Sequence, residues 1–208
     1  MPRRDTYTTE SLLSVAVEVF NVRGYDGTSM EDLAKAAGIS KSSIYHHVSG
    51  KEELLRLAVT RALDGLFAVL DEPALAGVGA AQQLSYVLDR TCQELVRNLP
   101  YVTLLLRVRG NSAAERAALD RRREFDHRVA ELVSAAIEEG DLRSDLDPRL
   151  TSRLIFGLVN SVSEWYRPHA DSHADGTSGS GHSGGHDGGQ DIAKALTTLV
   201  FEGMRRRD

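Results

Sequence analysis

The chain has one cysteine, one tryptophan and no long apolar run among its 208 residues. A single thiol, Cys92, excludes an intrachain disulfide and favours a reducing compartment. No apolar stretch approaches the roughly 20 residues that cross a bilayer. The segment that follows Met1 is polar, unlike a secretory leader. The sequence therefore predicts a cytoplasmic protein with no membrane partner.

A surplus of basic residues is also missing. The net charge is −5, from 25 Lys and Arg against 30 Asp and Glu. A protein that binds nucleic acid by its bulk charge is basic, so any such contact in this chain must be local. The hydrophobic fraction of 41% and the charged fraction of 26% are ordinary for a globular protein. The length suits one domain or two modest ones.

Strand patterns are absent as well. Apolar residues recur every three or four positions along most of the chain, which is the spacing of one helix face. We therefore expect an all-α fold of nine helices. The segment 171–190 contains seven glycines and no large apolar residue, and it is predicted to be a disordered loop. Its histidines have no helix to hold them, so neither a metal site nor a cofactor is expected.

Residues 24–55 are typical of two short helices joined by a tight turn, with a third helix directly after. Thr28 and Glu31 have the spacing of a capping box for the first helix. Gly38 supplies a turn residue that adopts positive φ without steric cost. Ser40 stands where the N-cap of the second helix belongs. This pattern predicts a helix-turn-helix that enters the DNA major groove.

The second of these helices, from Lys41 to about Val48, is mostly polar. It buries only Ile44 and Val48, so it is better explained as a contact surface than as the solvated helix of a generic bundle. Side chains near the start of such a helix reach base edges, whereas contacts with phosphates position the protein. The predicted DNA-contacting residues are Thr28, Lys41, Ser42, Ser43, Tyr45, His46 and Lys51.

The run from Leu12 to Leu55 resembles the N-terminal domain of TetR (tetracycline-repressor) family regulators. Ser42 and Val48 depart from it, since the family often has Gly and Phe there. The resemblance implies a homodimer on a palindromic operator of double-stranded DNA, with a DNA-binding domain (1–50) and a ligand-binding and dimerisation domain (51–208). The matching residues are Ala16, Phe20, Gly24, Tyr25, Thr28, Asp32, Leu33, Ala34, Ala37, Gly38, Ile39, Ser40, Tyr45, His47, Lys51, Glu52, Glu53 and Leu54.

The last two predicted helices, one from about Pro148 to Arg167 and one directly after residue 190, carry apolar residues on more than one face. A helix that is apolar nearly all round must be buried nearly all round. A symmetric four-helix interface between two chains explains this pattern, and ordinary packing within one chain is the alternative. The predicted dimer-interface residues are Leu154, Gly157, Leu158, Ser161, Leu196, Leu199 and Val200.

The helices predicted between about Leu84 and Arg167 mix apolar side chains with a few polar ones, as small-molecule sites do. Several arginines gather there, either as a cationic mouth for an anionic ligand or as a solvated helix face paired with nearby acids. The predicted ligand-binding residues are Leu88, Cys92, Tyr101, Leu105, Arg109, Arg121, Arg122, Phe125, Asn160, Glu164 and Trp165.

A second resemblance covers residues 140–168. With Gly157, Asn160 and the run Trp165-Tyr166-Arg167-Pro168, this segment resembles the C-terminal part of TetR-type repressors of lipid and aromatic-acid catabolism. The resemblance implies an acyl-CoA or aryl-CoA effector. An uncharged lipophilic effector, or a DNA-binding protein without a ligand, stays open as an alternative. No catalytic motif is present, so we expect a repressor released from DNA by its ligand rather than an enzyme.

Overall fold

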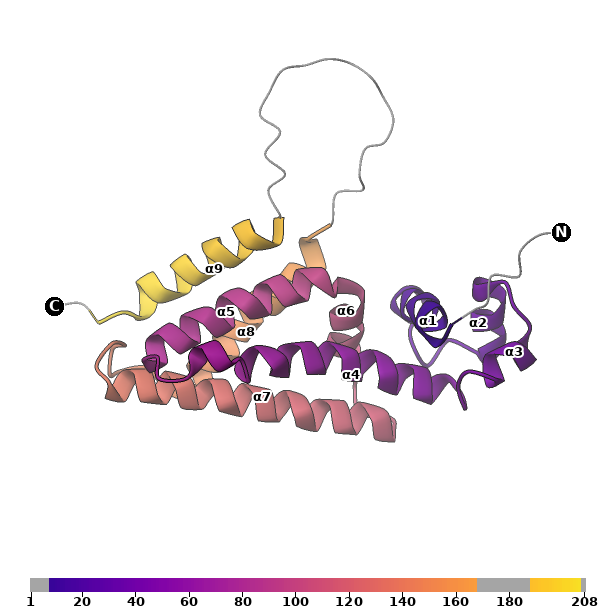
Figure 1. The fold of residues 1–208 in the computed structure, drawn as a ribbon, viewed down its shortest axis with the longest axis horizontal. Coiled ribbons are helices and arrows are strands. Elements are labelled where there is room, and N and C mark those ends of the chain that lie inside the picture. The colour runs from indigo at the N-terminus through magenta and orange to yellow at the C-terminus, as the bar shows by residue number, and fades with distance from the viewer. Residues whose placement is uncertain (1–7, 168–187, 207–208) are drawn as a thin grey trace, which may run out of the picture. The chain divides into compact units, whose positions relative to one another are not determined.

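The structure is a computed structural model that describes residues 8–167 and 188–206. Within these residues the regular elements are all helices, with one isolated bridge between Leu142 and Arg205, and the expected all-α fold is confirmed. The elements are α1 Thr9–Arg23, α2 Met30–Ala37, α3 Lys41–Tyr45, α4 Lys51–Leu70, the 3₁₀ helix η1 Pro73–Leu75, α5 Ala80–Arg97, α6 Leu99–Arg107, α7 Ala113–Glu138, α8 Pro148–Trp165 and α9 Gly188–Met204 (Figure 1).

Two predicted boundaries differ from the structure. The helix that begins at Lys41 ends at Tyr45, earlier than the predicted Val48, because the backbone N–H of His46 turns to the carbonyl of Ser43. Most of the predicted loop 171–190 lies outside the described residues. Its last three residues belong to α9, which begins at Gly188.

The chain divides into two compact units. Unit 1 comprises Met1–Ala68 and Asn98–Phe125, and unit 2 comprises Val69–Arg97 and Asp126–Asp208. The proposed domain boundary at residue 50 stays a prediction. In the structure α6 and the first half of α7 lie in the same compact unit as the N-terminal helices.

In unit 1, α1 packs on α2 and α6, and α2 packs on α3 (Figure 1). Phe20, Leu33 and Ile44 are almost completely buried and form part of the core of these helices. Two hydrogen bonds join α6 to α1. The side-chain amide of Asn21 donates to the carbonyl of Pro100 over 2.8 Å, and Arg107 donates to the carbonyl of Asn21 over 2.5 Å.

In unit 2, α9 runs beside α5, and both helices contact α8 (Figure 1). The buried face of α5 follows the predicted helical spacing, with Leu84, Leu88 and Leu95 about 1% exposed. The carboxylate of Glu139 accepts the backbone N–H of Ala80 over 2.8 Å and so satisfies a donor at the start of α5. Unit 2 thus holds a helical core of its own.

Candidate nucleic-acid interface and effector residues

The helix-turn-helix consists of α2, a glycine turn and α3. Gly38 lies at φ +67° in the left-handed region, and its N–H bonds to the carbonyls of Ala34 and Lys35. Ser40 then caps α3 by accepting the N–H of Ser43 over 3.1 Å. The predicted turn and the predicted N-cap of α3 are both confirmed. Ile44, which is 0% exposed, anchors α3 to the core of unit 1 and leaves its other face outward.

The capping box of α2 was predicted one residue too early. The N-cap is Ser29, whose hydroxyl accepts the N–H of Asp32 over 3.1 Å, and Asp32 accepts the N–H of Ser29 over 2.9 Å. Thr28 is 2% exposed, and its hydroxyl donates to the carbonyl of Gly24 over 2.7 Å. A phosphate contact by Thr28 stays a prediction, and it would require this hydroxyl to leave that carbonyl.

The electrostatics of the cap follow from these bonds. The hydroxyl and the backbone N–H of Ser29 hold the pKa of Asp32 below its ordinary value, and nearby Arg23 lowers it further. Arg23 also forms an ion pair of 2.5 Å with Asp32. A negative charge at this position favours the first turn of α2, where backbone N–H groups carry partial positive charge.

Most predicted DNA-contacting side chains face solvent. Lys41, Ser42 and His46 are exposed, and Tyr45 is 50% exposed. Ser43 is half-buried. The hydroxyls of Ser42 and Ser43 both lie within 3 Å of the Ser40 hydroxyl, so they share hydrogen bonds at the start of α3. Lys41, Ser42, Tyr45 and His46 are accessible to a ligand as large as DNA.

Lys51 differs from these residues. Its ammonium donates to the carbonyls of Tyr25 and Thr28 over 3.1 and 3.0 Å and reaches the carbonyl of Asp26 at 3.5 Å. It also lies 4.6 Å from the centre of the Tyr25 ring. Lys51 therefore closes the loop between α1 and α2 from the start of α4. Its predicted contact with phosphate stays a prediction that must compete with these internal bonds.

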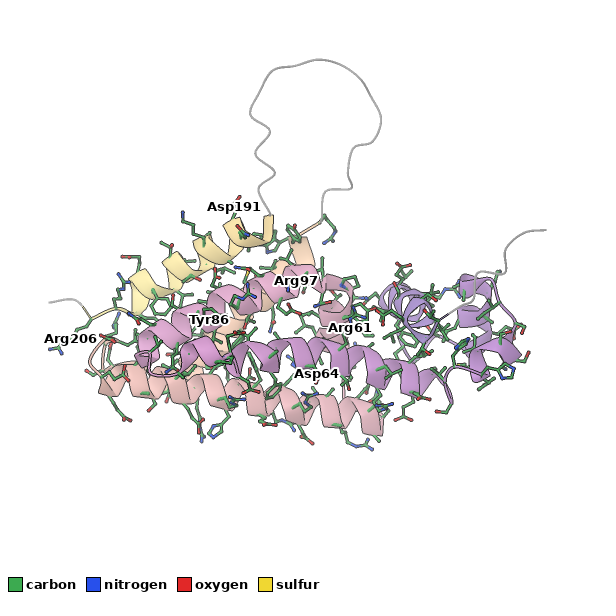
Figure 2. The ribbon with its side chains drawn as sticks, viewed as in Figure 1. Arg61, Asp64, Tyr86, Arg97, Asp191 and Arg206 are labelled. Atoms are coloured by element: carbon green, nitrogen blue, oxygen red, sulfur yellow. The ribbon has the colours of Figure 1, made fainter. Side chains whose placement is uncertain are left out.

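Six predicted effector residues belong to unit 1. Tyr101, Leu105 and Phe125 are buried, as expected for the wall of an apolar site. Arg121 forms an ion pair of 2.9 Å with Asp64 of α4, which Figure 2 labels, and its guanidinium lies 4.9 Å from the centre of the Phe67 ring. The remaining two, Arg109 and Arg122, have no hydrogen bond or ion pair with any described residue.

The other five effector residues belong to unit 2. Leu88 and Cys92 are buried on α5, and burial raises the pKa of the Cys92 thiol to about 11, with Asp89 adding to the effect. Asn160 is half-buried, Glu164 is exposed, and Trp165 is 58% exposed. Since the eleven residues are divided between two units, a common effector pocket stays a prediction.

An apolar row on α8 faces outward. Leu150, Leu154 and Leu158 follow one another at intervals of four residues and are 56%, 62% and 42% exposed. Leu199 of α9 is 65% exposed. Val200, in contrast, is 8% exposed and packs inside its own unit. Of the other predicted interface residues, Gly157 is exposed, whereas Ser161 and Leu196 are half-buried. Leu150 was not among the predicted interface residues, although it continues the same four-residue spacing.

Unit 1 also contains a cavity of about 620 Å³ that sequence analysis did not identify. It lies between the end of α1, the α1–α2 loop, Leu55 of α4 and the segment that joins α6 to α7. Arg23, Arg107 and Arg109 line it. These residues come from segments about 85 positions apart, so no local pattern could have indicated the site.

Comparison with known proteins decides the family. Residues 12–58 match the family model described as bacterial regulatory proteins, tetR family, and residues 77–175 match the tetracyclin repressor-like C-terminal domain. The chain is 56% identical to SCO3833 of Streptomyces coelicolor A3, a TetR regulator of known structure, with 97% of this chain and 94% of that chain covered and a TM-score of 0.83. The chain belongs to the TetR family.

Two further similarities place it among its relatives. The chain is 28% identical to the transcriptional repressor KstR2 of Rhodococcus jostii RHA1 over 160 residues, which cover 76% of this chain and 78% of that protein. The structure of AibR in complex with isovaleryl coenzyme A and operator DNA shares the fold, with a TM-score of 0.72 and 22% identity over 93% of this chain and 97% of that one. The TetR-family regulator is a DNA-binding transcription factor, as the sequence predicted, and not an enzyme.

Two further findings, on membrane spans and on metal sites, apply to the described residues alone. None of the helices in this part of the chain is long and apolar enough to cross a membrane. The same residues contain no group of three or more His, Cys, Asp or Glu side chains that is able to hold a metal ion. The histidines between 168 and 187 lie outside the described residues.

Proposed function

We propose that this TetR-family regulator is a homodimeric cytoplasmic repressor that binds a palindromic operator through α3 and leaves it when a CoA thioester binds. The observation that supports DNA binding is the exposed polar face of α3. Ser40 caps the N-terminus of this helix, and buried Ile44 packs its opposite face against the core of unit 1. In a dimer the two recognition helices must lie about one helical turn of DNA apart, roughly 34–36 Å.

The homodimer is supported by the outward leucine row of α8 together with Leu199 of α9. An exposed apolar row of this length costs solubility unless another surface covers it. A second copy of the same chain is the natural partner, because a two-fold interface uses the same patch on both subunits.

The CoA thioester is supported by chemistry and by a relative of the same fold. The thioester needs an apolar wall for its acyl group and cations for its phosphates. Buried Tyr101, Leu105 and Phe125 supply apolar surface in unit 1, and Arg109 and Arg122 have no partner among the described residues. AibR, which shares this fold, was crystallised with isovaleryl coenzyme A and operator DNA.

One observation favours the alternative, an uncharged lipophilic effector. Three arginines of α7 already have carboxylate partners. Arg121 pairs with Asp64, and Arg123 pairs with Asp120. Arg128 pairs with Asp71 over 2.7 Å. Arginines engaged in this way form a solvated helix face and leave fewer cations for phosphates.

Release from DNA requires a difference in affinity. A ligand shifts the equilibrium only to the extent that it binds the DNA-incompetent form better. We propose that the effector binds among α5 to α8 and moves α4, whose residues 51–68 belong to unit 1 and whose last two belong to unit 2. Movement of α4 would change the spacing of the two recognition helices.

The effector is tested by titration of the protein–operator complex with acyl-CoA and aryl-CoA compounds, the matching free acids and a set of uncharged lipophiles. Fluorescence anisotropy of labelled operator DNA reports release. We expect the thioesters to release the protein and the free acids to act poorly. Release by an uncharged lipophile alone would replace the CoA proposal with the alternative. If no compound acts, both effector proposals fail.

The DNA surface is tested with two kinds of variant. Tyr45→Ala should weaken binding to all sequences alike, because a contact with phosphate carries no sequence information. Ser42→Ala should shift the order of preference among operator variants. Tyr45→Phe is the matched control that keeps the ring and removes only the hydroxyl. If folded Tyr45→Ala and Ser42→Ala proteins bind every operator like the wild type, α3 is not the DNA surface.

A further inference from the structure

The cavity of unit 1 has the size and the lining of a small-molecule site. Its volume of about 620 Å³ lies within the range of about 300–1,000 Å³ that ligand pockets occupy. Phe20, Leu55 and Leu104 lie at its base as part of the packed core, and each is at most 3% exposed. We call it the α1–α6 cleft, because the ends of α1 and α6 form two of its walls.

Cations outnumber carboxylates in the lining of the α1–α6 cleft. Arg23, Arg107 and Arg109 line it, against Asp26 and Glu115. Arg109 is exposed and has no hydrogen bond or ion pair with any described residue. The hydrogen bond that Arg107 donates to the carbonyl of Asn21 uses one of its nitrogens. A planar guanidinium has five N–H donors in a fixed fork, so both residues retain donors that match a phosphate.

The segment that carries Arg109 is held in place. Glu115, 4% exposed, accepts the backbone N–H groups of Asn111 and Ser112, the latter over 3.3 Å. Arg116 donates to the carbonyl of Gly110 over 3.2 Å. Because backbone donors neutralise part of its charge, the Glu115 carboxylate repels an anion less than a free carboxylate would. A fixed segment loses little conformational entropy when a ligand binds.

The opposite wall of the cleft is the loop that precedes the helix-turn-helix. Gly24, Tyr25, Asp26 and Gly27 line the cleft, and α2 begins only three residues after Gly27. Asn111 donates to Asp26 over 3.4 Å and so joins the two walls. A ligand that separates these walls would displace the loop from which α2 emerges.

We propose that the α1–α6 cleft takes the phosphate-bearing end of the effector, with Arg107 and Arg109 on the phosphates. The inference rests on the proposed response to CoA thioesters. The two arginines suit phosphate oxygens, and the Asp26 carboxylate accepts hydrogen bonds from ribose hydroxyls or an exocyclic amine. Because the cleft adjoins the α1–α2 loop, occupation of the cleft weakens DNA binding, and operator DNA weakens ligand binding by the same factor.

The experiment measures binding of free CoA and of adenosine 3′,5′-bisphosphate to the full-length protein by titration calorimetry. Arg109→Ala is the principal variant, because it removes no bond to a described residue and should fold normally. It should raise the Kd of both probes about tenfold, which corresponds to about 1.4 kcal/mol, because a charge-assisted hydrogen bond to phosphate is lost. Arg109→Lys, which keeps the charge and loses the fork, should lose less. Arg123→Ala, an exposed arginine paired with Asp120, is the matched control and should bind like the wild type.

The same variants are then compared in the release of operator DNA by a CoA thioester. Arg109→Ala should need about ten times more thioester, with operator affinity unchanged in the absence of ligand. If thioesters release the wild type and Arg109→Ala at the same concentration, the cleft assignment fails while the proposed function stands. If free CoA binds in an Arg109-dependent way but no thioester releases DNA, the proposed function fails and the cleft remains an anion site. If neither probe binds the wild type, the assignment is wrong.

Discussion

The ammonium of Lys51 lies 4.6 Å from the centre of the Tyr25 ring and donates to the Tyr25 carbonyl over 3.1 Å. Lys51 is the first residue of α4, and Tyr25 lies in the loop between α1 and α2. One side chain thus fixes the start of α4 to the segment from which the helix-turn-helix emerges. The contact involves no residue of α3.

Lys51→Met should destabilise the fold and leave the salt dependence of operator binding almost unchanged. Methionine keeps the length of the side chain, and the loss of the bonded cation costs about 1–2 kcal/mol of unfolding free energy. Urea unfolding measures the stability. Lys35→Met, a change of an exposed lysine on α2, should cost far less.

The salt titration separates this role from a contact with phosphate. Each lost phosphate contact lowers the slope of log K against log salt by about 0.9. Lys41→Met at the exposed start of α3 should show such a loss. If Lys51→Met lowers this slope by the same amount and is as stable as the wild type, Lys51 contacts a phosphate and does not hold the α1–α2 loop.

Asp32→Asn should lower the midpoint of unfolding, and Glu31→Gln should not. Asp32 occupies the capping box with Ser29, whereas Glu31 is its exposed neighbour. The pKa of Asp32 is lowered in the folded state. Its contribution to the stability of the fold is therefore present above the unfolded pKa near 3.8 and is lost as the pH falls through the folded pKa. Thermal unfolding of both variants at pH 7 and at acid pH measures the difference. Equal effects of the two changes would contradict the assigned box.

Leu158→Arg combined with Leu199→Arg should produce monomers or insoluble protein. An unpaired guanidinium inside an apolar interface loses hydration without gaining a partner. Light scattering coupled to gel filtration measures the mass. Val22→Arg is the control, because Val22 is also an exposed apolar residue, at 84%, but lies on α1. A double variant that keeps the wild-type dimer mass would show that the leucine row serves another purpose.

Wild-type stability should fall between pH 8 and pH 10 because of Cys92. The pKa of the thiol is raised from 9.0 to about 11 by burial and then by Asp89. Its contribution to stability is therefore complete below about pH 8 and declines as the unfolded chain ionises, by about 1 kcal/mol at pH 10. Cys92→Ala should show a flatter profile over this range, from a lower starting stability. Urea unfolding at each pH measures the free energy of unfolding. If this free energy falls equally with pH in the wild type and in Cys92→Ala, the thiol does not contribute to the pH dependence.

The helices and the helix-turn-helix are determined by the sequence alone, since the signals that define them are local. Gly38 makes the turn and Ser40 caps α3, and each acts on residues at most four positions away. The capping box shows the limit of local reading. Thr28 with Glu31 and Ser29 with Asp32 have the same spacing. The structure has Ser29 as the N-cap, because the Thr28 hydroxyl is bonded to the carbonyl of Gly24 instead.

Only the tertiary structure decided how the distant polar groups pair. Lys51 meets carbonyls 23 to 26 positions earlier in the chain, and Arg121 meets Asp64, 57 positions away. Of the arginines of the α1–α6 cleft, Arg23 ends α1, Arg107 ends α6 and Arg109 lies in the segment after α6. Periodicity reports which side chains share a helix face, but it carries no information about which faces meet. That choice depends on how the buried side chains of several helices fit together at once.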